Sequence, residues 1–133
     1  MGEEQNKAMV RLAVEEIFNK QNPDAVDKYH TADFINHDPS LPQVRSLEEY
    51  KQWIEAILTA YPLPGYRVIT DDIIAEGDRV VMRWTCQSTG KEATFTGATV
   101  YRLVGDKIAE CWWIYDMLGV LQQVGVIPTI GQT

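Results

Sequence analysis

The sequence has few of the residues on which several protein classes depend. It contains two cysteines and two histidines, which show neither a CxxC nor a zinc-ligand spacing. A glycine-rich phosphate loop and a Ser-His-Asp arrangement in a recognised motif are also missing. We therefore expect no metal and no cofactor.

Basic residues are scarce as well. The chain has 12 Lys and Arg against 19 Asp and Glu, a formal net charge of −7. Nucleic acids and anionic membranes are bound by clustered positive charge, so neither partner is expected. No apolar run approaches the roughly 20 residues of a membrane span. The N-terminus is acidic, unlike a signal peptide, which favours a cytoplasmic protein with reduced thiols.

The length of 133 residues fits one domain, and nothing resembling a linker interrupts residues 1–133. Apolar residues at helical spacing predict an amphipathic helix over roughly 4–20 and a short helix over 22–29. A brief extended segment is expected at 33–37. Ser46 and Glu49 form a capping box that predicts the start of a third helix.

The second half predicts four long strands. Side chains alternate in character there, and Gly77-Asp78 and Gly105-Asp106 are typical of hairpin turns. The predicted strands cover residues 66–76, 79–87, 93–104 and 107–116, and a short helix follows at 117–124. Helices followed by a run of strands indicate an α+β fold.

Period-2 alternation separates two faces of this sheet. We expect the uncharged lines to face the helices; they comprise Val80, Met82, Trp84, Cys86, Phe95, Gly97, Thr99, Tyr101, Leu103, Ala109, Cys111, Trp113 and Tyr115. The opposite face is also partly apolar, with Val81, Ala98, Val100, Trp112 and Ile114. That much apolar surface predicts a homodimer through the outer sheet face.

Six segments together resemble the SnoaL-like polyketide cyclase family. They are residues 33–39 (DFINHDP), 75–81 (AEGDRVV), 83–85 (RWT), 95–97 (FTG), 106–110 (DKIAE) and 118–125 (LGVLQQVG). The resemblance implies an NTF2-like cone, in which a curved antiparallel sheet wraps over three N-terminal helices. Members of the family close the last ring of aromatic polyketides by an intramolecular aldol reaction without a metal or cofactor.

The resemblance transfers only part of the family's catalytic site. Its acid/base aspartate aligns with Trp113 and its assisting histidine with Thr99, so both groups are replaced. A pocket asparagine is matched by Asn36, and Cys111 stands where many relatives carry a histidine. Ketosteroid isomerases, which share the cone, place a proton-shuttling aspartate in an Asp-Pro step similar to that of Asp38.

Three residues are candidate catalytic groups, and each has a structural alternative. Asp38 is a base or a turn residue, because Asp-Pro often starts a turn. His37 shuttles a proton in the cavity or bonds a backbone carbonyl at its rim. Asp116 acts in catalysis or caps the helix that follows it. His30 is expected to be a surface residue or a cation at a helix end.

An aromatic wall predicts a ligand cavity inside the cone. The expected ligand-binding residues are Asn36, Trp84, Phe95, Thr99, Tyr101, Cys111, Trp113 and Tyr115, and Asn36 and His37 are expected to line the same cavity as Trp113 and Thr99. The alternative is a solidly packed core. The partner expected is a small hydrophobic or aromatic molecule.

Three functions fit this prediction. The first is a cyclase or isomerase that acts by acid/base catalysis on an enolisable carbonyl substrate. The second is a binding module on the same fold without chemistry, and the third is a protein-interaction domain that uses the outer face. A solvent-accessible cavity would separate the first two functions from the third.

Overall fold

The computed structural model describes residues 2–59, 67–87, 94–129 and 131. Its helices are α1 (Glu3–Val14), α2 (Val26–Tyr29), α3 (Leu47–Thr59) and α4 (Met117–Gln123), with a π-helical turn at Glu15–Asn19 and a 3-10 turn at Pro23–Ala25. Its strands are β1 (His30–His37), β2 (Arg67–Glu76), β3 (Arg79–Gln87), β4 (Thr94–Val104) and β5 (Lys107–Tyr115). No helix in these ranges is long and apolar enough to cross a membrane.

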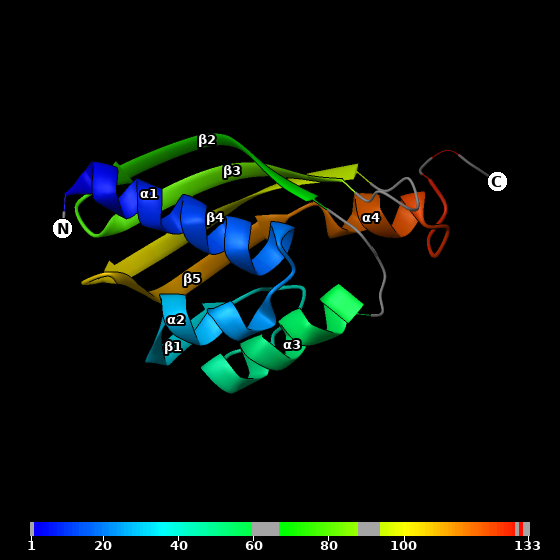
Figure 1. The fold of residues 1–133 in the computed structure, drawn as a ribbon. Coiled ribbons are helices and arrows are strands. Elements are labelled where there is room, and N and C mark those ends of the chain that lie inside the picture. The colour runs from blue at the N-terminus through cyan, green and yellow to red at the C-terminus, as the bar shows by residue number, and fades with distance from the viewer. Residues whose placement is uncertain (1, 60–66, 88–93, 130, 132–133) are drawn as a thin grey trace.

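The five strands form one open, curved sheet in the order β1-β5-β4-β3-β2. Helices α1, α2 and α3 lie on one side of it, and α4 follows the end of β5 (Figure 1). The α+β class is therefore confirmed, but the sheet is mixed and not wholly antiparallel. The reason is that β1 joins the edge of the sheet parallel to β5, which follows it by about 70 residues in sequence.

The helix signals act where the sequence places them. The first helix buries Val10, Ala13 and Val14, and the π-helical turn continues this stripe with Ile17 and Phe18. Before α3, the Glu49 backbone N–H donates to Ser46 Oγ at 3.1 Å and the Ser46 N–H donates to Glu49 Oε1 at 2.9 Å. This reciprocal pair satisfies two amides at the helix start and confirms the predicted capping box.

The sheet faces also follow the alternation. Along β3 every second residue is buried, and Gly77 and Gly105 take the positive φ angles of 60° and 62° that tight hairpin turns require. One correction concerns the start of β5. The sequence predicts that the line of inward-facing residues on this strand begins at Ala109. A bulge pairs Leu103 with Ile108 instead, so the consecutive residues Ile108 and Ala109 are both buried.

Candidate functional site

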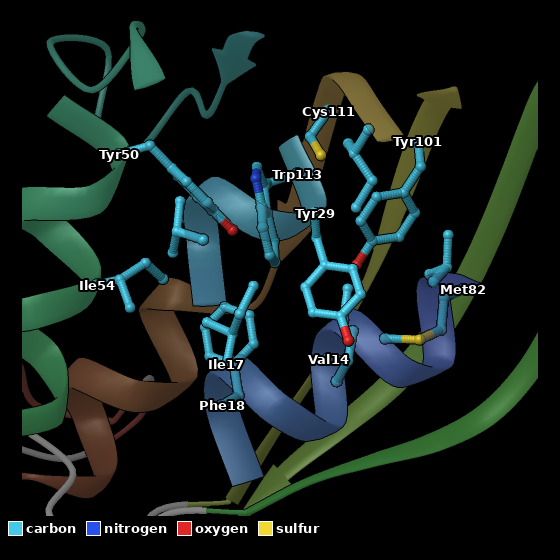
Figure 2. Close-up of a cluster of buried hydrophobic side chains, with 14 of the residues drawn as sticks. Val14, Ile17, Phe18, Tyr29, Tyr50, Ile54, Met82, Tyr101, Cys111 and Trp113 are labelled. Atoms are coloured by element: carbon cyan, nitrogen blue, oxygen red, sulfur yellow. The ribbon is translucent and has the colours of Figure 1, made fainter. Parts of the chain in front are cut away.

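A cavity of about 450 Å3 lies between the inner face of the sheet and the helices. Figure 2 shows how side chains of the first helical segment meet those of the sheet beside it. The lining is almost entirely apolar and aromatic. It consists of Val14, Phe18, Leu41, Trp53, Ala56, Ile57, Val68, Met82, Trp84, Cys86, Phe95, Tyr101, Trp113, Tyr115, Met117, Val120, Leu121 and Val124.

Five of the eight expected ligand-binding residues line this cavity: Trp84, Phe95, Tyr101, Trp113 and Tyr115. The other three, Asn36, Thr99 and Cys111, are buried but are not among its lining residues. The first five alternate along three neighbouring strands, so the register of the pleat brings them to one wall.

The aromatic rings hold one another at fixed angles. Trp84 packs edge-on against Trp113, with ring centroids 6.3 Å apart, and against Phe95 at 5.6 Å. Gly97 makes this packing possible, because a Cβ atom there would lie 2.6 Å from the Trp84 ring and 2.7 Å from Tyr115 Cβ. A wall of this kind favours a flat apolar guest.

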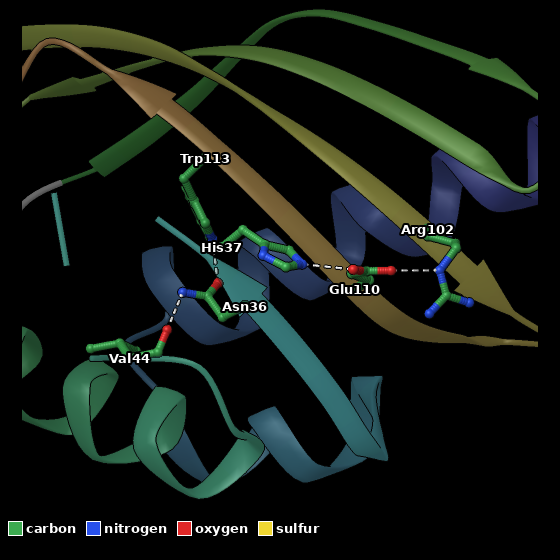
Figure 3. Close-up of polar contacts among 6 residues, drawn as sticks. All are labelled: Asn36, His37, Val44, Arg102, Glu110 and Trp113. Atoms are coloured by element: carbon green, nitrogen blue, oxygen red, sulfur yellow. Dashed lines mark hydrogen bonds and ion pairs between the residues drawn. The ribbon is translucent and has the colours of Figure 1, made fainter. Parts of the chain in front are cut away.

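Asn36 holds Trp113, a residue of the cavity wall, by a hydrogen bond. The Trp113 indole Nε1 donates to Asn36 Oδ1 at 2.6 Å, and Asn36 Nδ2 donates to the Val44 carbonyl at 3.0 Å (Figure 3). Both ends of the buried amide are thus occupied within the protein. Asn36 therefore fixes the orientation of Trp113 and is not among the residues that line the cavity.

Asp38, which is buried, and Tyr115, which is partly buried, form a hydrogen-bonded pair at the cavity. The Tyr115 hydroxyl donates to Asp38 Oδ2 at 2.8 Å, and the Ser40 backbone N–H donates to Asp38 Oδ1 at 2.9 Å. Only 5% of Asp38 is exposed, and this burial raises the pKa of its carboxyl although both hydrogen bonds oppose the change. Burial and the neighbouring carboxylate raise the pKa of Tyr115, which keeps it a neutral phenol.

His37 lies outside the cavity. Its Nε2 donates to Glu110 Oε2 at 2.6 Å, and Glu110 Oε1 accepts from Arg102 Nε at 2.9 Å (Figure 3). The His37 ring stacks on Trp112 with centroids 5.2 Å apart. Consecutive strand residues point to opposite faces, so Asn36 and His37 cannot share one cavity. The prediction that they do is wrong, and no cavity role remains for His37.

Two further polar residues, Asp116 and His30, have structural roles. Asp116 is the N-cap of α4, and its Oδ1 accepts from the Gly119 N–H at 2.8 Å. His30 is 3% exposed, so the expected surface position is wrong. Its Nδ1 lies 2.8 Å from the Val26 carbonyl and its ring packs between Phe34 and Tyr50.

The cysteines are inert thiols. Burial raises the pKa of Cys86 to about 12 and that of Cys111 well above its usual range, so neither is a thiolate near neutral pH. Among the described residues, no three His, Cys, Asp or Glu side chains come together as metal ligands.

The helices supply cavity residues that the sequence did not single out. The sequence could have indicated Val14 and Phe18 as inward-facing residues, since both belong to the apolar stripe of the first helix. Leu121 lies on the short C-terminal helix and Val124 at its end. The apolar residues of this helix do not indicate from sequence whether they line a cavity or pack in a core.

A family model described as SnoaL-like polyketide cyclase matches residues 8–124. The chain belongs to this family. A structure from Acidithiobacillus ferrooxidans, assigned as a polyketide cyclase, is 30% identical with a TM-score of 0.79, covering 90% of this chain and 93% of that one. The resemblance predicted from the six segments is thus confirmed. No curated protein matches the chain.

More distant structures share the NTF2-like fold of this SnoaL-like protein. An LEH-like epoxide hydrolase from M. tuberculosis is 16% identical with a TM-score of 0.74, covering 92% of this chain and 93% of that one. A protein from Kribbella flavida, assigned as a ketosteroid isomerase, is 12% identical with a TM-score of 0.69, covering 86% and 79%. One fold thus carries several chemistries, so function has to be argued from the cavity itself.

Proposed function

We propose that this SnoaL-like protein binds a small aromatic molecule in the cavity. The observation that carries the proposal is the cavity itself, whose volume of about 450 Å3 is bounded almost wholly by apolar and aromatic side chains. Cavities of several hundred Å3 with such walls are typical of small-molecule sites. Membership of a family named for cyclases of polyketides supports the same ligand class.

Titration calorimetry with 2-acetylnaphthalene tests this proposal. A flat ketone of this size should bind with a dissociation constant of about 10–100 μM, within the affinity range for a ligand of so few atoms. Leu121→Trp, which adds bulk to a lining residue of α4, should weaken binding about tenfold or more. Leu118→Trp is the matched control, because Leu118 lies on the same helix, is 49% exposed and does not line the cavity. Equal effects of the two variants, or no binding to the native protein, would count against cavity binding.

A second candidate function is proton transfer to and from an enolisable carbonyl ligand. It is favoured by the pairing of Asp38 with Tyr115, because Tyr115 lines the cavity while Asp38 lies behind it. A ligand C–H proton would pass to Tyr115 Oη as the phenol proton passes to Asp38 Oδ2. The products are an enolate ligand and a neutral carboxyl, so charge and atoms balance. Binding without chemistry is the alternative, and the rate of hydrogen exchange distinguishes the two.

We also propose a homodimer through the outer sheet face. Ile74 and Ile114 are 65% and 70% exposed there, and the half-buried Trp112 lies on the same face. Arg83 pairs with Asp72 on this face at 2.6 Å, and Arg102 pairs with Glu110 at 2.9 Å, so a second copy would meet balanced charge. Light scattering should give about twice the chain mass, and Ile114→Lys should restore the monomer. A native monomer would contradict the dimer.

The redox state of the two cysteines is related to the cellular compartment of the protein. Both are free and buried, and they lie on different strands without forming a disulfide. Unpaired thiols are usual where glutathione keeps proteins reduced. This observation supports the proposal of a cytoplasmic location.

A further inference from the structure

Tyr101 is the most deeply buried polar residue of the cavity wall. It lies on β4 between Val80 of β3 and Cys111 of β5, and only 3% of its surface is exposed to solvent. Its side chain is nevertheless part of the cavity lining. Figure 2 shows its ring reaching from the strand into the space between the sheet and the helices.

Three other polar hydrogens of the wall are already bound within the protein. The Trp84 Nε1–H donates to Thr99 Oγ1 at 2.9 Å, and the Trp113 Nε1–H donates to Asn36 Oδ1. The Tyr115 O–H donates to Asp38. Because indole N–H groups have no second hydrogen to offer, neither tryptophan can bind a ligand oxygen in this arrangement.

Tyr101 differs from these three residues. Thr99 accepts from Trp84 and also hydrogen-bonds the Tyr101 hydroxyl, so the Thr99 hydrogen can be donated onward to the Tyr101 phenol oxygen. The chain of donors therefore runs from Trp84 through Thr99 to Tyr101. Among the residues that the structure describes, Thr99 is the hydrogen-bond partner of the Tyr101 hydroxyl, and a phenol that accepts from Thr99 keeps its own hydrogen for a ligand.

We propose that the Tyr101 hydroxyl is the hydrogen-bond donor that recognises an acceptor oxygen, such as a ketone or quinone carbonyl, on the bound aromatic molecule. This inference rests on the proposed cavity binding and adds the polarity of the ligand to it. Thr99 is a positioning residue, because it directs the phenol without lining the cavity. Donor chains of this kind strengthen their last member by polarisation.

This donor is separate from the Asp38–Tyr115 pair. Tyr101 lies opposite Cys111 and Tyr115 lies opposite Gly97, so the two tyrosines are four strand positions apart. At about 3.4 Å per residue their backbones are separated by roughly 14 Å. The wall thus offers a donor at one position and a phenol whose hydrogen is already used at another. A ligand with a carbonyl oxygen for Tyr101 and a hydroxyl group that donates to the Tyr115 oxygen would match both positions.

The test compares a ketone with a hydrocarbon of the same shape. Titrations of the native protein and of Tyr101→Phe with 2-acetylnaphthalene and 2-isopropylnaphthalene give four dissociation constants. We expect the native preference for the ketone to fall about tenfold in Tyr101→Phe, since a hydrogen bond contributes about 1 kcal/mol or slightly more. Tyr29→Phe removes the same atom from a tyrosine that does not line the cavity and whose hydroxyl bonds Glu16, so it should leave the preference unchanged.

Infrared spectroscopy of the bound ketone, labelled with 13C at the carbonyl, provides a readout that does not need a variant. The carbonyl band of the ketone bound to the native protein should lie at lower wavenumber than in hexane. Where Tyr101→Phe folds, the band should return toward the hexane position. A hexane-like band in the native protein, or an unchanged ketone preference in Tyr101→Phe, would refute the role of Tyr101 while leaving cavity binding intact. If neither naphthalene binds, the proposed function fails as well.

Discussion

Acidification from pH 7 to pH 4 should cost this protein about 3 kcal/mol of folding free energy through His30 alone. Burial lowers the pKa of His30 from its usual 6.5 to about 4, although the Val26 carbonyl and Asp27 favour the charged form. Between these two pKa values, His30 binds a proton in the unfolded chain but not in the folded protein. Stability is complete above the unfolded pKa and is lost as the pH falls from 6.5 toward 4, at about 1.4 kcal/mol per pKa unit.

Chemical denaturation of the native protein and of His30→Phe across pH 4–7 measures this contribution. The Phe variant cannot be protonated, so its free energy of unfolding should fall less steeply in this window. Glu49 and Glu110, whose hydrogen bonds lower their pKa values, contribute equally to both proteins. Parallel curves for the two proteins would show that His30 accepts its proton without cost, contrary to its buried position.

Asp38→Asn should slow enolisation of a bound ketone about 100-fold, if the protein catalyses proton transfer. The amide cannot accept the proton that Tyr115 passes on, whereas its carbonyl oxygen keeps the hydrogen bond from the Ser40 N–H. Incorporation of deuterium into the methyl group of 2-acetylnaphthalene in D2O, followed by NMR, measures the rate. In the native protein the rate should rise with pH as Asp38 loses the proton that its raised pKa retains.

The control for this variant is Asp72→Asn. Asp72 is an exposed carboxylate that is paired with Arg83 and does not line the cavity, and its replacement should leave the exchange rate unchanged. Asp38→Asn removes a buried negative charge and retains a bond, so its stability should stay within about 1 kcal/mol of the native value. Equal exchange rates for native protein and Asp38→Asn would exclude Asp38 as the acid/base group and favour binding without chemistry.

Most of the fold could be predicted from the sequence because its signals are local. The capping box at Ser46, the hairpin glycines and the alternation along β3 each act within a few residues. The parallel pairing of β1 with β5 could not be predicted, because it joins segments about 70 residues apart and leaves no periodic trace. The bulge that buries both Ile108 and Ala109 is likewise a property of two strands together.

The candidate site was predictable only in part. Alternation brings Trp84, Trp113 and Tyr115 to one wall, but whether large rings leave space depends on the volumes that the helices supply. His37 illustrates how strongly a face assignment depends on register. Asn36 faces inward, whereas His37, one residue further along β1, lies on the outer face against Trp112. The acceptor for Tyr115 is Asp38, 77 residues away in sequence, and no spacing rule connects them.

The central claim is that the space enclosed by Trp84, Trp113 and Val124 accepts a small aromatic guest. Crystals soaked with 2-bromonaphthalene test it most directly, because anomalous scattering locates the bromine without reference to any model. We predict one dominant bromine peak inside the cavity, within contact distance of these three side chains. Bromine found only on the outer surface, or a cavity closed by collapsed rings, would contradict the account.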